Sequence, residues 1–180
     1  MRRHLIIALV LATLLASAPV YAGQFWKSDD SAYWWYWDDA PRIELLVPAD
    51  LKVYAQHKIF GESLLDINLS DNGPVLRVAC VSKMRGGWTA LKQMSTARWQ
   101  HILSDIKIAS EKDYTSEQGI PFKFIEATGT LPSGKVGMIR LAAFFKDQDV
   151  AYVELFCESK EYTGNVKNHW MKAIHTLKWR

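Results

Sequence analysis

The chain is poor in cysteine, with two among its 180 residues and no C-x-x-C pair. An even number of cysteines permits one disulfide in an oxidising compartment, and the sequence leaves a Cys80–Cys157 bridge and two separate thiols equally open. Both residues end alternating apolar runs, so their side chains are expected to point into a core. Because buried thiols are inert, this pattern argues against redox chemistry.

The chain also lacks a strong charge of either sign. Its formal net charge is +3, and two of the positive charges are Arg2 and Arg3, which belong to the N-terminal segment described next. Nucleic-acid binding needs a basic stripe, so a nucleic-acid partner is not expected. After residue 22 no run approaches the roughly 20 apolar residues that a membrane span needs, so no span is expected either.

Residues 1–22 have the composition of a signal peptide. A positive start, Arg2, Arg3 and His4, precedes an apolar stretch from Leu5 to Leu15, and residues 20–22 offer small or apolar side chains at a cleavage site. We therefore expect cleavage near Ala22 and a mature protein that is periplasmic or secreted.

Catalytic and metal-binding motifs are missing. The sequence contains no P-loop, no G-x-S-x-G, no H-E-x-x-H and no clustered Cys/His spacing. Glu154 and Glu158 share one face of an expected strand, where they would serve either as an acid–base pair or as part of a solvated or helix-flanked sheet face. The sequence thus predicts a protein that is not an enzyme, with no cofactor and no metal.

Alternating apolar residues and turn signals divide the rest of the chain into strands and two helices. The first helix is expected at 89–106, with Thr89 as N-cap and an apolar stripe that includes Trp99, Ile102 and Ile106. The second is expected at 165–179. Strands are expected at 42–47, 51–54, 63–69, 75–83, 108–116, 120–131, 136–146 and 150–158. Tight turns between long strands favour antiparallel pairing, so the fold class is α+β, one antiparallel sheet flanked by two main helices.

This order of elements resembles the PsbP-like group of α/β/α sandwiches over about residues 42–180. The resemblance is carried by the opening strand Ile43–Pro48, the hairpin through Gly73, the helix around Trp99, the paired strands Phe122–Leu131 and Val136–Lys146, and the strand Val150–Cys157 before the closing helix Trp170–Leu177. It implies a non-catalytic accessory subunit, assembly factor or chaperone-like binder, and it supplies no catalytic set.

Residues 23–41 are unusual because aromatic side chains alternate with aspartates, and we treat them as an N-terminal arm before a single domain at 42–180. Half of the eight tryptophans lie here: Trp26, Trp34, Trp35 and Trp37. Trp and Tyr are favoured at binding surfaces, so these residues are the candidate contacts for another exported or envelope protein. Two alternatives stay open: the arm packs on its own sheet, or it binds a glycan or a cationic small ligand. The oligomeric state is left open.

Overall fold

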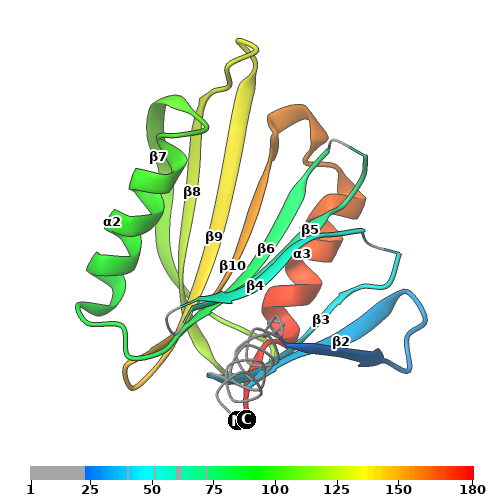
Figure 1. Cartoon of the computed structure of the whole chain (residues 1–180). Helices are drawn as coiled ribbons and strands as arrows, with labels where there is room; N and C mark the ends of the chain where they lie inside the picture. Colours follow the sequence, from blue (N-terminus) through cyan, green and yellow to red (C-terminus); the bar gives the residue numbers. More distant parts are fainter. Residues whose placement is uncertain (1–22, 40, 51, 60–61, 72) are drawn as a thin grey trace, which may run out of the picture.

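The computed structural model describes residues 23–39, 41–50, 52–59, 62–71 and 73–180. The expected signal peptide, residues 1–22, lies outside the described residues. Two sheets and two helices make up this part of the chain (Figure 1). Neither of the described helices is long and apolar enough to cross a membrane.

The large sheet has seven strands, and every neighbouring pair is antiparallel. The expected strands at 136–146 and 150–158 correspond to β9 and β10, two neighbouring inner strands of this sheet, where turn signals and alternation were clearest. In spatial order the strands are β4 (Lys52–Ile59), β5 (Glu62–Asn68), β6 (Val75–Val81), β10 (Asp149–Glu158), β9 (Val136–Lys146), β8 (Pro121–Thr130) and β7 (Ser104–Thr115).

The expectation of one sheet flanked by two helices is wrong, because a second sheet of four strands covers part of the large one. Its order is β1 (Gln24–Lys27), β2 (Tyr33–Asp39), β3 (Arg42–Pro48) and β11 (Lys178–Trp179). The β-prone aromatic run of β2 pairs with β3 along its whole length, from Tyr33 opposite Pro48 to Asp39 opposite Arg42. The segment treated as a separate arm is therefore part of the fold.

Both helices end earlier than the apolar periodicity predicted. Helix α2 (Gly87–Trp99) stops at Trp99, and the chain enters β7 at Ser104, so Ile102 and Ile106 lie beyond it. Its N-cap is Gly86, in a left-handed conformation with φ of 85°, and not Thr89. Helix α3 (Gly164–Thr176) ends before Lys178, which pairs with β3. A short 3-10 helix, η1 (Ser159–Glu161), joins β10 to α3.

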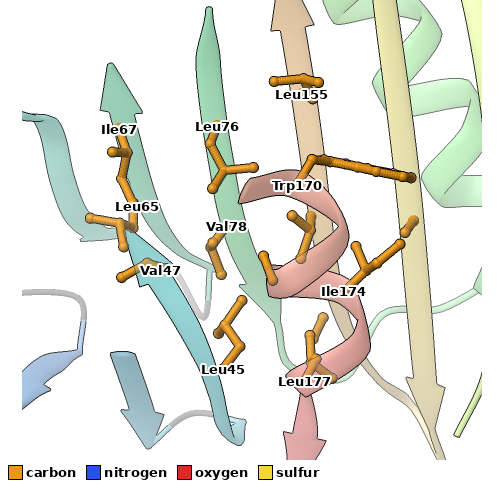
Figure 2. Packing of buried hydrophobic residues seen from close by; sticks show 14 of the residues in the cluster. Leu45, Val47, Leu65, Ile67, Leu76, Val78, Leu155, Trp170, Ile174 and Leu177 are labelled. Carbon is orange, nitrogen blue, oxygen red and sulfur yellow. The ribbon is translucent and has the colours of Figure 1, made fainter. Parts of the chain in front are cut away.

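Side chains alternate between the two faces of the large sheet and build two cores. On one face, α2 buries Leu91 and Trp99 against β8, β9 and β10. On the other face, α3 and the small sheet lie together, with Val47 of β3 near Leu65 of β5 (Figure 2). Burial of these apolar side chains stabilises the three-layer arrangement by about 25 cal/mol for each Å² of apolar surface removed from water.

Candidate functional site

The outer face of the small sheet carries a cluster of partly exposed aromatic side chains. Residues two apart on a strand point to the same side, so Tyr33, Trp35 and Trp37 of β2 share this face while Tyr36 points into the core. Trp26 of β1 lies directly opposite Trp35 in the register and joins them. The Trp26 and Trp37 ring centroids are 6.5 Å apart. We call these four residues the tryptophan face.

Three basic side chains lie over the rings of the tryptophan face. The Lys178 Nζ is 4.9 Å from the centroid of Trp35, and the Arg180 guanidinium carbon is 5.9 Å from that of Trp26. From α3, the Lys172 Nζ lies 5.3 Å from the Tyr33 ring. Cations at these distances are attracted to the negative faces of the rings. The outer face of the small sheet is therefore both aromatic and basic.

One buried carboxylate, that of Glu44, organises the basic side chains. Glu44 is 2% exposed and lies in the centre of β3, opposite Lys178 of β11 in the register. Its two oxygens form ion pairs with Lys178 and Arg180, whose side chains are about half exposed. The carboxylate thus holds two cations beside the tryptophans, and the group of three cations and one carboxylate keeps a positive charge.

The structure brings together three of the four tryptophans that the sequence nominated. Trp34 points to the opposite side of β2, where its ring contacts Phe25 with a centroid distance of 6.3 Å. It is 40% exposed, much like Trp26 at 37%, although it belongs to a different surface. Trp34 is therefore removed from the candidate site.

Asp38, one of the aspartates of the aromatic segment, lies on the core side of β2, away from the tryptophan face. Asp38 is fully buried and accepts hydrogen bonds from the Tyr36 hydroxyl, at 3.1 Å, and from the Ser63 hydroxyl of β5. Burial and the neighbouring carboxylate raise the pKa of Tyr36 above its usual value. These contacts tie the small sheet to the large one, so Asp38 has a structural role.

Sequence reasoning missed the cations of this face and their carboxylate. Lys178 was placed at the end of the helix expected at 165–179, Arg180 was given no role, and Glu44 was one residue of the strand expected at 42–47. The only signal available was the spacing of Lys178 and Arg180, which puts both on one side of a strand. Their position beside β2 depends on pairing between β3 and β11, which are far apart in the chain.

The two glutamates considered as an acid–base pair have separate structural partners. The buried Glu154 carboxylate accepts hydrogen bonds from Arg98 Nη2 at 2.6 Å and from Trp99 Nε1 at 2.8 Å. Glu158 lies nearer the surface and pairs with Lys135 and Lys160. Glu154 therefore lies on a sheet face covered by a helix, which is one of the two expected alternatives, and it bonds to that helix.

The candidate disulfide is ruled out by the strand register. Cys80 and Cys157 are buried thiols of the core beneath α3, as their apolar neighbours predicted. Cys80 lies opposite Ala151, and Cys157 is six residues further along β10, a separation of roughly 20 Å at the usual rise of a strand. A disulfide requires Cα atoms within about 7 Å. Burial raises the pKa of Cys157 to about 12, which further lowers its reactivity.

No protein family matches the chain, and no curated protein matches it. Among solved structures, a protein of unknown function, PA94 from Pseudomonas aeruginosa, is 13% identical with a TM-score of 0.49, covering 88% of this chain and 98% of that one. A chain from Bacteroides thetaiotaomicron is 11% identical with a TM-score of 0.48, and the match spans 88% of this chain but 48% of that one. A mutant of Mog1 is 9% identical with a TM-score of 0.47, over 87% of this chain and 95% of that one.

Proposed function

We propose that this protein is an exported, non-catalytic accessory factor that binds an acidic surface of another exported or envelope protein through the tryptophan face. The observation that carries the proposal is the cluster of Trp26, Trp35 and Trp37 with Lys178 and Arg180 on one sheet face. Trp and Arg are the residues most enriched among those that dominate binding energy at protein interfaces. The export part rests on the composition of residues 1–22.

The arrangement favours an acidic protein over the two small-ligand alternatives. A cationic ligand would have to displace Lys178 and Arg180 from the rings and would be repelled by them. A sugar stacks on an open ring face, but the same two side chains lie over the rings of Trp35 and Trp26. Carboxylates of a partner would instead meet the half-exposed cations while its apolar groups contact the ring edges.

The test compares two tryptophans of similar exposure on opposite sides of β2. Tagged full-length protein is crosslinked in cells that produce it, recovered under denaturing conditions, and the crosslinked partner is quantified and identified by mass spectrometry. Trp26→Ala and Arg180→Gln are expected to lower the yield at least about tenfold, equivalent to about 1.4 kcal/mol, because each removes a contact of the tryptophan face.

Trp34→Ala is the matched control, since Trp34 is equally exposed but faces away from the cluster. It should retain the crosslink, and the wild-type yield should fall in high salt because the pairing is electrostatic. Equal loss in Trp26→Ala and Trp34→Ala would show that the outer face has no special role and would refute the proposal.

A further inference from the structure

A pocket of about 410 Å³ lies between α3 and the part of the large sheet formed by β7, β8 and β9. We call it the aromatic pocket; its walls include Tyr114, Phe124, Tyr162 and Trp170, with Arg140 among them. None of the residues of the tryptophan face lines this pocket. The two sites share only helix α3, which carries Lys172 beside Tyr33. Its volume falls within the range of about 300–1,000 Å³ typical of small-ligand sites.

Arg140 is the charged group of this pocket, and the aromatic side chains surround it. Its guanidinium carbon lies 5.1 Å from the Phe124 centroid, 4.8 Å from that of Tyr162 and 4.7 Å from that of Trp170. Burial lowers the pKa of Arg140 below its usual value, because the rings exclude the water that would solvate the cation.

The hydrogen-bonding capacity of Arg140 is only partly used by the protein. Its Nε lies 3.2 Å from a carboxylate oxygen of Glu126, and its Nη1 donates to the Tyr162 hydroxyl. Among the described residues, none accepts a hydrogen bond from Nη2. A guanidinium presents its donors in a planar fork that suits a carboxylate, so Nη2 is available to bind one.

A second donor of the same pocket lacks an acceptor. Trp170 is 2% exposed, and its indole Nε1 has no hydrogen-bond partner among the described residues. Buried indole N–H groups usually find a partner. Figure 2 shows the side chain of Trp170 leaving α3 and extending across the face of the large sheet. Trp170 therefore lends the pocket a flat wall, and Arg140 Nη2 is the donor that points to an anionic oxygen as its acceptor.

The remaining lining residues set the character of a ligand. Lys167 of α3 adds a second cation, and His175 of α3 accepts a hydrogen bond at Nδ1 from the Glu117 N–H. No carboxylate is among the described lining residues, although Glu126 pairs with Arg140 from outside the lining, so Arg140 and Lys167 leave a net positive charge. Tyr114 is 46% exposed at the outer wall and stacks on Phe122 with a centroid distance of 5.7 Å. The pocket therefore combines a positive potential with flat apolar walls.

We propose that the aromatic pocket binds a small monocarboxylate with an apolar body, such as a free aryl- or alkyl-substituted acid. The carboxylate accepts a hydrogen bond from Arg140 Nη2, and the apolar body packs against Tyr114, Phe124 and the Trp170 ring. This site does not depend on the proposed protein-binding function, since the tryptophan face uses other side chains.

The experiment is calorimetric titration of the purified protein with three probes of one shape: 4-phenylbutyrate, 4-phenylbutanol and 4-phenylbutylamine. The acid is expected to bind at least about tenfold more tightly than the alcohol, and the amine not at all, because Arg140 and Lys167 repel it. Equal binding of acid and alcohol, or no binding of the acid, would overturn the proposal.

Variants locate the binding. Lys167→Ala and Tyr114→Ala change pocket side chains near the surface and should weaken 4-phenylbutyrate several-fold, whereas Lys172→Ala on the same helix and Ile108→Ala on the same strand should not. Arg140→Gln should abolish the preference for the acid over the alcohol. If Arg140→Gln does not fold, as judged by circular dichroism, the two surface variants decide: wild-type affinity in both would exclude this pocket.

Discussion

Replacing Glu154 by Gln should loosen α2 from the large sheet and lower the stability of the whole protein. Glu154 is 5% exposed, and its carboxylate accepts from Arg98 and Trp99, both in the last turn of α2. These contacts hold the last turn of α2, whereas Trp88 and Lys92 attach its first half to the more exposed Glu111 of β7.

The expected loss of stability depends on which of the two neighbouring arginines is left without a carboxylate. Arg77, which is 4.0 Å from Glu154, keeps its two 2.7 Å hydrogen bonds to Asp66. Arg98 Nη2 donates to the same carboxylate oxygen as Trp99 Nε1, so an amide oxygen in that place can still accept from both, and Arg98 also keeps the Tyr152 hydroxyl at 3.2 Å. Arg98 nevertheless becomes a half-buried cation without a carboxylate. The amide oxygen of Gln still accepts from Trp99, so we expect a loss of about 3 kcal/mol, at the lower end for a broken buried ion pair.

The assay is urea unfolding followed by circular dichroism. With a slope of roughly 2 kcal/mol per M, a loss of about 3 kcal/mol lowers the midpoint by about 1.5 M. Glu158→Gln is the control on the same strand, and because its lysine partners are mostly exposed its midpoint should stay close to that of the wild type. A Glu154→Gln midpoint equal to that of Glu158→Gln would refute the reasoning that Glu154 anchors the helix.

Two further predictions concern glycine and the thiols. Gly129→Ala should destabilise the fold by about 1–3 kcal/mol in the same urea assay, because a Cβ there would lie 2.7 Å from the Ser104 carbonyl oxygen and 3.0 Å from Leu103 Cβ. Gly164 has open space around it, so Gly164→Ala should be neutral or slightly stabilising. Similar losses in both variants would contradict the packing argument. Without reductant, both cysteines should react with iodoacetamide in urea. In the native protein at pH 8, Cys157 should react at least about a hundredfold more slowly, because burial raises its pKa from 9.0 to about 12 and so lowers the thiolate fraction. Absence of alkylation in urea would mean that the two cysteines are bridged.

The strands were predictable wherever local pattern decided the outcome. In β9 and β10 the period of two and the turn between them fixed both position and pairing. The end of α2 was not predictable from the pattern. Ile102 and Ile106 continue the helical spacing by coincidence, but Ile102 lies in the turn after α2 and Ile106 lies in β7. The second sheet was missed because β2 is aromatic on both faces, so its sequence does not specify a partner, and because β11 is too short to carry a pattern.

Of the candidate site, the tryptophans could be grouped from the sequence, but the charged residues beside them could not. Strand periodicity alone separates Trp34 from Trp35 and Trp37, so that grouping could have been made from the sequence. The neighbours that complete the face, Glu44 and Lys178, come from strands separated by more than a hundred residues. Only the tertiary structure places them beside the tryptophans.

The small sheet also constrains the order in which the protein is assembled. Strand β3 pairs on one side with β2, its neighbour in the sequence, but its other side receives β11 from the far end of the described chain. The ribosome makes the aromatic strands long before β11, because β11 lies more than a hundred residues further along the chain. Pairing β11 with β3 also closes a long loop, which costs entropy and slows this step of folding. Until α3 and β11 arrive, β3 presents an open apolar edge, and this interval is when the growing chain is most exposed to aggregation.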